Sequence, residues 1–487
     1  MERINTSLAE INSGLKIGLF GIGLDTYWPQ FDGLKERLEG YLKVVEQNLS
    51  KIHPAIVNAG LVDTADKAFQ AGRLFKTADV DIIFLYVTTY ALSSTVLPVV
   101  QRAKVPVIIL NLSPEEAIDY ASFNAMKDRT KMTGEWLAHC SPCSVPEIAN
   151  VFNRVGIKFH QITGLLHNDP ESWNEIAEWV QAARAANILF YNRLGCMGHY
   201  YSGMLDIYTD LTQLYAHFGG HIQLIEVEEL AVLRKGVTQK EMKGRLNLFY
   251  HVFDVQSDCS VEELEKAAVT SVALDRLVER HKLGSLAYYY EGTGSSENED
   301  AISSIILGNS LLTANNVPVA GEYEIKNAQA MKIMDIFGAG GSFTEYYAMD
   351  FKDNVVLMGH DGPGHLAIAE GKAKVRPLQV YHGKVGKGVS VEMRVKNGPV
   401  TLLSVVEKKD KLMLLVAEGE SVPGPILQIG NTNSRYQFSI GARRFVNEWN
   451  RHGPAHHCAI GVGHIASKIE KLGQLLNMEV VKVCPIP

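Results

Sequence analysis

Short, almost continuous apolar runs separated by helical segments fill the chain up to about residue 290, and they restrict its fold more than any other feature. Runs of this kind are typical of strands buried on both faces, and their alternation with helices indicates parallel pairing in an α/β sheet. A helical segment at 171–186 separates two of the runs. The pattern predicts two doubly wound parallel-sheet domains. The first series of runs comprises residues 15–24, 55–61, 80–88 and 105–112, and the second comprises 156–163, 187–191, 221–226 and 285–291.

After about residue 355 the sequence changes to alternating apolar and polar residues between turn signals. This pattern predicts antiparallel β structure. Strands are expected at 388–395, 400–406 and 411–417, a helix at 459–476, and a last strand in the segment MEVVKV. We therefore predict three domains: an α/β domain at 1–150, a central α/β domain at 151–350, and a β-rich antiparallel domain with a terminal helix at 351–487.

The charge and hydropathy of the chain exclude several classes of partner. A net charge of -7, with no cluster of Lys and Arg, argues against nucleic acid, because phosphates are neutralised by basic faces. No apolar run reaches the ~20 residues that cross a bilayer, so no membrane is expected. The amino terminus, MERINTSLAEINSG, has neither the basic start nor the apolar run of a secretory signal. We predict a cytoplasmic protein that acts on a small molecule and keeps its six cysteines reduced.

Glutamates and histidines surrounded by glycines gather between residues 321 and 365. Glu322 begins a helical pattern, Glu345 follows the stretch GAGGS, and His360 ends an apolar strand-like run. A histidine pair, His456-His457, lies in the segment GPAHH. Carboxylate oxygens and imidazole nitrogens together suit Mn²⁺ and similar ions. Taken singly, each of these side chains also fits a solvated helix end or a hydrogen-bonded histidine.

The segments GEYEIKNAQAMKIM, GGSFTEYYAMDF, VVLMGHDG and GPAHH resemble, in order and approximate spacing, the metal-site segments of the L-arabinose isomerases within the L-arabinose/L-fucose isomerase family. The resemblance implies an aldose–ketose isomerase that acts on a sugar through an enediol, and a homo-oligomer, whether trimer, tetramer or hexamer. It implies that Glu322 and Glu345, both in the predicted central domain, are the catalytic acid and base. The implied ligands of a divalent metal, usually Mn²⁺, with Co²⁺ or Mg²⁺ as alternatives, are Glu322, Glu345, His360 and His457, the last matched as the second histidine of its pair.

The reaction explains why such residues are needed. Aldose–ketose interconversion moves a proton between adjacent carbons and places negative charge on two sugar oxygens. A divalent ion stabilises that charge as a Lewis acid, and a carboxylate near the carbon-bound proton can act as base. The sequence does not assign base and acid between Glu322 and Glu345.

The chain departs from the arabinose isomerase pattern beside both glutamates. Tyr323-Glu324 follows Glu322 where that subfamily typically has Gly-Asp, and Tyr346 rather than an acidic residue follows Glu345. The sequence therefore leaves the sugar open, and an isomerase or epimerase of a modified or anionic sugar, sulfonated or carboxylated, is an alternative. Arginine binds carboxylate, phosphate or sulfonate oxygens. The candidate substrate-binding residues are His456, Asp25, Tyr27 and Arg435.

Several competing interpretations remain open at the level of sequence. Gly21-Ile-Gly23 matches the start of a dinucleotide-binding turn, but threonine occupies the position of the third glycine. Cys140 and Cys143 form a CxxC, which fits a redox pair or half a zinc site. No second CxxC completes a zinc site, so two thiols are favoured. The polar loop at 292–300 either lines a pocket or caps the next helix. A non-catalytic sugar-binding protein and a metal-dependent aldolase or epimerase are the rival functions.

Overall fold

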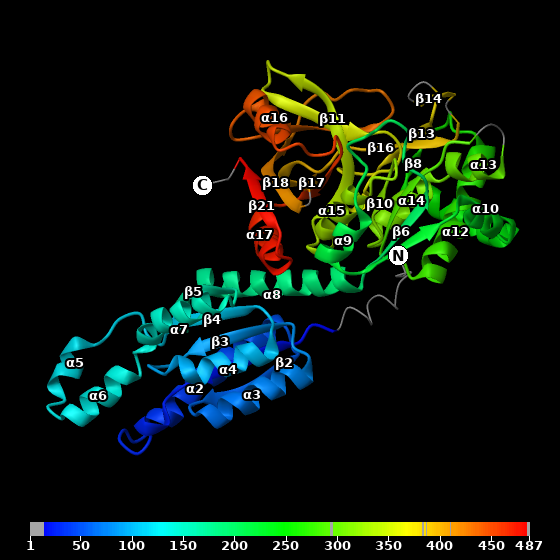
Figure 1. The fold of residues 1–487 in the computed structure, drawn as a ribbon. Coiled ribbons are helices and arrows are strands. Elements are labelled where there is room, and N and C mark those ends of the chain that lie inside the picture. The colour runs from blue at the N-terminus through cyan, green and yellow to red at the C-terminus, as the bar shows by residue number, and fades with distance from the viewer. Residues whose placement is uncertain (1–13, 293–295, 382–383, 386, 410, 485–487) are drawn as a thin grey trace. The chain divides into compact units, whose positions relative to one another are not determined.

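The computed structural model describes residues 14–292, 296–381, 384–385, 387–409 and 411–484 (Figure 1). These residues form two compact units, which we call the smaller unit (residues 13–187) and the larger unit (residues 188–487). Two parallel sheets are followed by an antiparallel β domain, so the predicted fold class is confirmed.

The smaller unit is built on a five-stranded parallel sheet with the strand order β2-β1-β3-β4-β5. All six residues of β1 and of β3 are buried, as the continuous apolar runs predict. The segment at 156–163 was expected to open the second sheet, but it forms β5, which pairs with β4 in the first. The strands are β1 (Ile17–Ile22), β2 (Ile56–Val62), β3 (Ile82–Val87), β4 (Val107–Ser113) and β5 (Phe159–Leu165).

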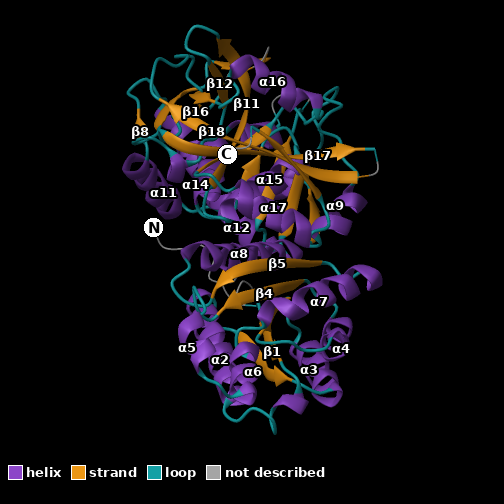
Figure 2. Ribbon diagram, turned by 90° about the vertical axis from the view of Figure 1, so that its left-hand side faces the viewer, coloured by secondary structure: helices purple, strands orange, loops and turns teal. Residues whose placement is uncertain are grey.

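Helices cover both faces of this sheet, and Figure 2 shows α2 on one side of β1 and α3 and α4 on the other. One core cluster joins α3, α4 and α7 to β1, β3 and β4. Within it Phe75 of α3 is fully buried and packs against Phe20 of β1, with ring centroids 6.0 Å apart. The helices are η1 (Asp25–Tyr27), α2 (Leu34–Ile52), α3 (Ala65–Ala78), α4 (Ser93–Ala103), α5 (Tyr120–Ala125), α6 (Arg129–Leu137), α7 (Ser141–Val155) and α8 (Pro170–Tyr191).

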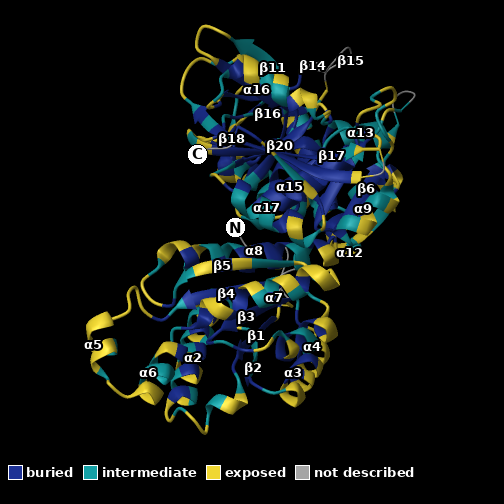
Figure 3. Ribbon diagram, turned by 60° about the vertical axis from the view of Figure 1, so that its left-hand side comes forward, coloured by how far each residue is buried: buried dark blue, intermediate teal, exposed yellow. Residues whose placement is uncertain are grey.

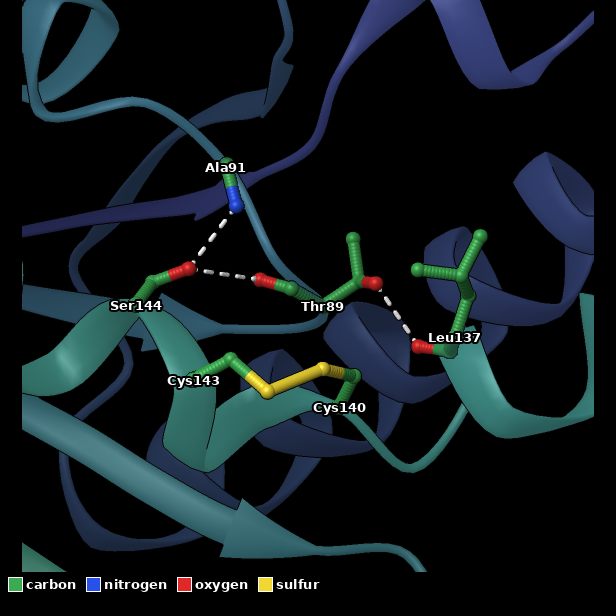
Figure 4. Close-up of a disulfide and its surroundings, with 6 residues drawn as sticks. All are labelled: Thr89, Ala91, Leu137, Cys140, Cys143 and Ser144. Carbon is green, nitrogen blue, oxygen red and sulfur yellow. Dashed lines mark hydrogen bonds between the residues drawn. A yellow bond between two sulfur atoms is a disulfide. The ribbon is translucent and has the colours of Figure 1, made fainter. Parts of the chain in front are cut away.

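A disulfide joins Cys140 to Cys143 across the first turn of α7 (Figure 4). The expectation that all six cysteines are reduced thiols is therefore wrong for this pair, which the sequence brings within one helical turn. Beside the disulfide, the Ser144 hydroxyl donates to the carbonyl of Thr89 at 3.2 Å and accepts from the backbone N–H of Ala91 at 2.8 Å. The other four cysteines are free thiols.

The larger unit begins with a four-stranded parallel sheet of order β10-β9-β6-β7. The apolar run at 187–191 was expected to be a strand, but it forms the carboxy-terminal end of α8, and the strand starts only at Arg193. The strands are β6 (Arg193–Gly198), β7 (His221–Ile225), β9 (Ser285–Tyr289) and β10 (Val319–Ala320). The associated helices are α9 (Leu211–Phe218), α10 (Val227–Lys235), α11 (Gln239–Val252), α12 (Val261–His281), α13 (Glu297–Ser303), α14 (Ile306–Ala314) and α15 (Ile325–Ile336).

The antiparallel part of the larger unit is a closed six-stranded barrel. Its strand order is β17-β20-β11-β12-β19-β18, and the pairing of β18 with β17 closes the ring. β21 (Glu479–Val483), the expected last strand, extends β18 in parallel. The segment at 459–476 was predicted as one helix, but it divides into the end of β20 and the helix α17 (Ala466–Leu475). The barrel strands are β11 (Gly340–Asp350), β12 (Val355–His360), β17 (Gly398–Lys408), β18 (Lys411–Val422), β19 (Thr432–Gln437) and β20 (Cys458–Val462).

A small sheet of order β16-β13-β8 completes the unit and lies beside the barrel. In Figure 3 the strands of the barrel are largely dark blue, which marks buried residues. None of the described helices is long and apolar enough to span a membrane. The remaining elements are β8 (Asp254–Val255), β13 (Lys374–Pro377), β14 (Val380–Tyr381), β15 (Lys384–Val385), β16 (Val389–Glu392), η2 (Leu366–Ile368) and α16 (Ala442–Arg451).

Candidate metal centre

Glu322 lies in the tight turn that connects β10 to α15. The turn closes through a hydrogen bond from the N–H of Glu324 to the carbonyl of Gly321 at 2.9 Å. Glu322 and Tyr323 both have positive φ, 54° and 63°. Non-glycine residues adopt this conformation only at a cost, and such strain concentrates at functional sites. The backbone that carries the Glu322 side chain is therefore in an unfavourable conformation of the kind found at functional sites.

The other three predicted ligands come from neighbouring barrel strands. Glu345 of β11 pairs with Gly359 of β12, which places it next to His360, the last residue of that strand. On its other side β11 pairs with β20, where Thr344 is opposite Cys458, so His457 lies directly before a strand adjacent to Glu345. Antiparallel register thus brings together residues more than a hundred positions apart in the sequence.

The donor atoms of these side chains converge. His457 Nε2 lies 3.4 Å from Glu322 Oε2, and His360 Nε2 lies 3.9 Å from Glu322 Oε1. Ligand atoms of Glu322, His360 and His457 lie within 4.8 Å of one another, and the same holds for Glu345, His456 and His457. His457 belongs to both groups, which places it at the centre of the cluster.

Several of these buried atoms lack hydrogen-bond partners. Glu322 Oε2 and both ring nitrogens of His457 are buried and make no hydrogen bond. Burial, and then the nearby imidazoles of His360 and His456, hold the pKa of His457 well below its ordinary value, so the ring is neutral and one of its nitrogens has a lone pair for a metal. Buried polar groups are normally paired. A carboxylate oxygen and a neutral imidazole left unpaired side by side therefore fit a divalent cation.

Carboxylates surround His360. Its Nδ1 lies 2.7 Å from the carbonyl oxygen of Asp361 and 3.1 Å from Asp361 Oδ1. Burial alone would lower the pKa of His360, but the carboxylates of Asp361, Glu345 and Glu322 outweigh it and raise the pKa to about 9. The site therefore favours positive charge at this point. A contact from Nδ1 to an oxygen leaves Nε2 directed toward Glu322, the arrangement common in histidines that bind metal.

His456 differs from His457 in its partners. Its Nδ1 lies 2.6 Å from Asp206 Oδ2, and its backbone N–H donates to the same oxygen at 2.9 Å. Its Nε2 lies 3.7 Å from Glu322. Half-exposed and fixed by Asp206, His456 is positioned to face a ligand from the edge of the cluster.

A cavity of about 340 Å³ opens at this cluster. Of the four predicted ligands, Glu322 and His360 line it, together with Asp361, the tyrosines 288–290 and Lys387. Two members of the polar loop at 292–300, Gly292 and Glu299, also line it. Ser296 caps α13 in a capping box with Glu299, so both interpretations of that loop apply to its described residues, while 293–295 lie outside them.

The remaining predicted site residues lie elsewhere. Asp25 and Tyr27 form η1 in the smaller unit, where Asp25 is exposed and Tyr27 packs on Trp28. Gly23 approaches the Trp28 ring so closely that an added Cβ would come within 2.9 Å of it, which gives this glycine a packing role.

Arg435 lies on β19 with 4% of its surface exposed. Its guanidinium contacts the carboxylates of Asp353 and Asp350 and donates to the carbonyl of Pro425. It is absent from the described lining of the cavity at Glu322.

Three acidic residues of this site are missing from the sequence predictions. Asp361 directly follows His360 in the segment GHDG. Its position at the end of a predicted strand is a signal that could have identified it as a site residue. Asp206 contacts His456 across 250 positions, and no local pattern indicates that pairing. Glu324 is fully buried, lies 3.7 Å from His457 Nδ1, and its pKa is raised to about 8 by burial.

Comparison with known proteins bears on the same part of the chain. Residues 340–479, from β11 to the start of β21, match the L-arabinose isomerase C-terminal domain. Residues 340–479 therefore form a domain of the L-arabinose isomerase C-terminal type. The match covers three of the four clustered ligands, Glu345, His360 and His457, whereas Glu322 precedes it.

Two relatives extend this similarity to other parts of the chain. A sulfoquinovose isomerase from Alkalicoccus urumqiensis is 22% identical over 414 residues, which cover 83% of this chain and 86% of that protein. An L-arabinose isomerase from Shewanella baltica (strain OS223) is 21% identical over 321 residues, which cover 61% of this chain and 62% of the relative. Both are named as isomerases of sugars, so the chain is similar to sugar isomerases over most of its length.

Proposed function

We propose that this protein is a metal-dependent aldose–ketose isomerase whose metal ligands are Glu322, Glu345, His360 and His457. The unpaired buried atoms of Glu322 and His457 carry the proposal, because leaving them without partners is costly unless a cation binds them. Two carboxylates and two imidazoles suit Mn²⁺, with Co²⁺ or Mg²⁺ as alternatives. A bound divalent ion would polarise two adjacent oxygens of the sugar as a Lewis acid.

The protein's own residues supply the proton transfer. Glu322 lines the cavity, and Glu345 lies on the adjoining barrel strand. One carboxylate takes the proton from C2 while the other group gives a proton to the carbonyl oxygen, which forms the enediol. The second group then takes the proton of the C2 hydroxyl, and the first carboxylate returns its proton to C1, which gives the ketose. His456, held by Asp206, lies at the edge of the cluster and contacts the sugar hydroxyls in this proposal.

A sulfonated sugar is the second candidate substrate. One relative that aligns over most of the chain is named as a sulfoquinovose isomerase, and the other as an L-arabinose isomerase. Their identities, 22% and 21%, favour neither sugar. Contacts of Asp25, Tyr27 and Arg435 with substrate, a homo-oligomer and a cytoplasmic location remain predictions.

A substrate panel tests the proposal. Protein loaded with Mn²⁺ is incubated with pentoses, deoxyhexoses and sulfonated or carboxylated sugars, and ketose formation is measured. We expect at least one aldose to yield its ketose, with loss of turnover on chelation and in Glu322→Gln. If every sugar remains an aldose while the protein binds Mn²⁺, a non-catalytic sugar-binding protein becomes the better interpretation. Carbon–carbon cleavage products would instead indicate an aldolase.

A further inference from the structure

A second cavity, of about 1050 Å³, lies in the larger unit next to the candidate metal centre. Strands β13 and β16 and the loop at 426–431 contribute its lining. Asp361 and Leu378 line both this cavity and the one at Glu322, so the two cavities meet at these residues.

Two other contacts support this neighbourhood. Asn431 of the second cavity lies 3.5 Å from the hydroxyl of Tyr347, which is two residues from Glu345 along β11. The next residue, Thr432, pairs with His360 across β19 and β12. The loop at 426–431 therefore ends directly beside a predicted metal ligand.

Basic side chains share one face of the small sheet. Lys374 and Arg376 of β13 flank Val375, which is fully buried on the opposite face, as the two-residue period of a strand requires. Arg376 pairs with Ser390 of β16. Arg394 follows four residues further along that segment and also lines the cavity, as does Lys372.

Two of these cations have unused hydrogen-bonding capacity. Lys374 makes no ion pair with any residue that the structure describes. Arg394 Nε is buried without a hydrogen bond, and its nearest carboxylate oxygen, on Glu370, is 3.9 Å away. Arg376 is bound to Glu392 at 2.7 Å through Nε. Four carboxylates also line the cavity, so its overall charge does not favour an anion. The groups that favour an anion are the ammonium of Lys374 and the Nε of Arg394, which make no hydrogen bond to the part of the chain that the structure describes.

We propose that this cavity binds an anionic group carried by the sugar, with Lys374 and Arg394 as the donors and Arg376 in support. The inference rests on the proposed function, since the aldose end of the same molecule would lie at Glu322 and His360. Sulfonate, phosphate and carboxylate share the needed chemistry, which is two or three oxygens that accept charged hydrogen bonds. A neutral sugar offers no charged oxygen to Lys374 and leaves the buried Nε of Arg394 unpaired, so the cavity favours the anionic sugar over it.

Matched sugars and four variants test the assignment. The Mn²⁺ form is assayed with an aldohexose, its 6-sulfonate, its 6-phosphate and its uronate. The variants are Lys374→Gln and Arg376→Gln, with Lys396→Gln as the control, because Lys396 is an exposed lysine that lines neither cavity. Lys374 is exposed, so its replacement leaves the fold intact. Arg376→Lys retains the positive charge but lacks the guanidinium group, so it distinguishes the effect of charge from that of guanidinium geometry.

We expect KM for one of the anionic sugars to rise by at least about tenfold in Lys374→Gln and Arg376→Gln, as loss of a charged hydrogen bond implies, while Lys396→Gln matches the unaltered protein. The sugar affected most identifies the anion. KM for the neutral aldohexose should not change. Equal changes for neutral and anionic sugars, or no change for either, overturn the assignment.

A binding measurement separates this inference from the proposed function. Inorganic sulfate is titrated into the Mn²⁺ form by calorimetry. If no sugar is isomerised but sulfate binds and Lys374→Gln weakens that binding, the anion cavity stands and the isomerase proposal fails. If sugars are isomerised but sulfate neither binds nor competes with them, the anion cavity is refuted and the isomerase proposal stands.

Discussion

The parallel sheet of the smaller unit and the candidate metal centre of the larger unit, which we call the rim (Glu322, Glu345, His360 and His457), bury different kinds of side chain. β3 buries six apolar residues in a row, and their burial stabilises the unit. The rim buries Glu322 Oε2 and the ring nitrogens of His457 without partners. Such atoms lower stability, and their retention side by side indicates a ligand. Burial in the parallel sheet explains the stability of the fold, whereas the unpaired atoms of the rim suggest a bound ligand.

The largest expected effect concerns the rim. Glu322→Gln keeps the size of the side chain but removes a ligand charge and a proton-transfer group, so turnover should fall roughly 10²–10⁴-fold with the thermal unfolding curve retained. Turnover is measured as ketose formation, and the thermal unfolding curve by circular dichroism. Glu479→Gln, on an exposed position of β21, is the matched control and should keep its activity. Full activity in Glu322→Gln would contradict the assignment.

A substitution in the core of the smaller unit should lower stability without changing the affinity for Mn²⁺. Phe75→Ala opens a cavity in the smaller unit, where Phe75 is fully buried against Phe20, and should lower the free energy of unfolding by about 3–5 kcal/mol. Denaturant unfolding measures the loss, and Mn²⁺ titration of the folded protein should give the same affinity as before. A parallel loss of Mn²⁺ affinity would remove the distinction between the two regions.

Metal removal should destabilise the protein through the rim alone. A ligand present at a hundred times its Kd stabilises the native state by about 2.7 kcal/mol, so a chelator should lower the melting temperature accordingly. Glu345→Gln should abolish the difference between the metal-loaded and chelated proteins. Phe75→Ala should preserve it. If both variants respond to the chelator alike, the metal binds elsewhere.

The smallest effect is expected at the disulfide of the smaller unit. Closing a loop as short as Cys140–Cys143 contributes about 2 kcal/mol by loop-entropy reasoning. Cys143→Ser should therefore unfold at lower denaturant than the oxidised protein and match the protein treated with a reductant. Identical stability of the oxidised and reduced forms would show that the pair contributes nothing.

The sequence predicts strands well where they are buried on both faces and therefore continuously apolar. The strands at 80–88 and 105–112 are continuous apolar runs, and the structure confirms both as β3 and β4. The same rule fails at 187–191, because this run forms the last turn of the long helix α8, where Leu189 is buried and Phe190 and Tyr191 are exposed. The true strand, RLGCMG, contains an arginine and two glycines and has no apolar run to reveal it.

The segment at 459–476 fails for a related reason, since β20 and α17 are both apolar and only a short turn separates them.

The sequence indicates the candidate ligands of the site but not the contacts between distant residues, because those contacts depend on tertiary structure. Glu322, Glu345, His360 and His457 lie in segments whose residue types suit a metal. The structure places them in two groups that share His457, one with Glu322 and His360 and one with Glu345 and His456. Their roles as ligands and catalysts remain predictions. The contact between Asp206 and His456 depends on how a loop after β6 meets the barrel, which tertiary structure alone determines. The basic face of β13 and β16 likewise appears only once the strands are paired.

Anomalous diffraction from crystals soaked in Mn²⁺ tests the central claim most directly. We predict one strong peak within coordination distance of Glu322, Glu345, His360 and His457, and no such peak in crystals of Glu322→Gln. A peak at another group of side chains, or none in a protein whose turnover requires Mn²⁺, would contradict the account.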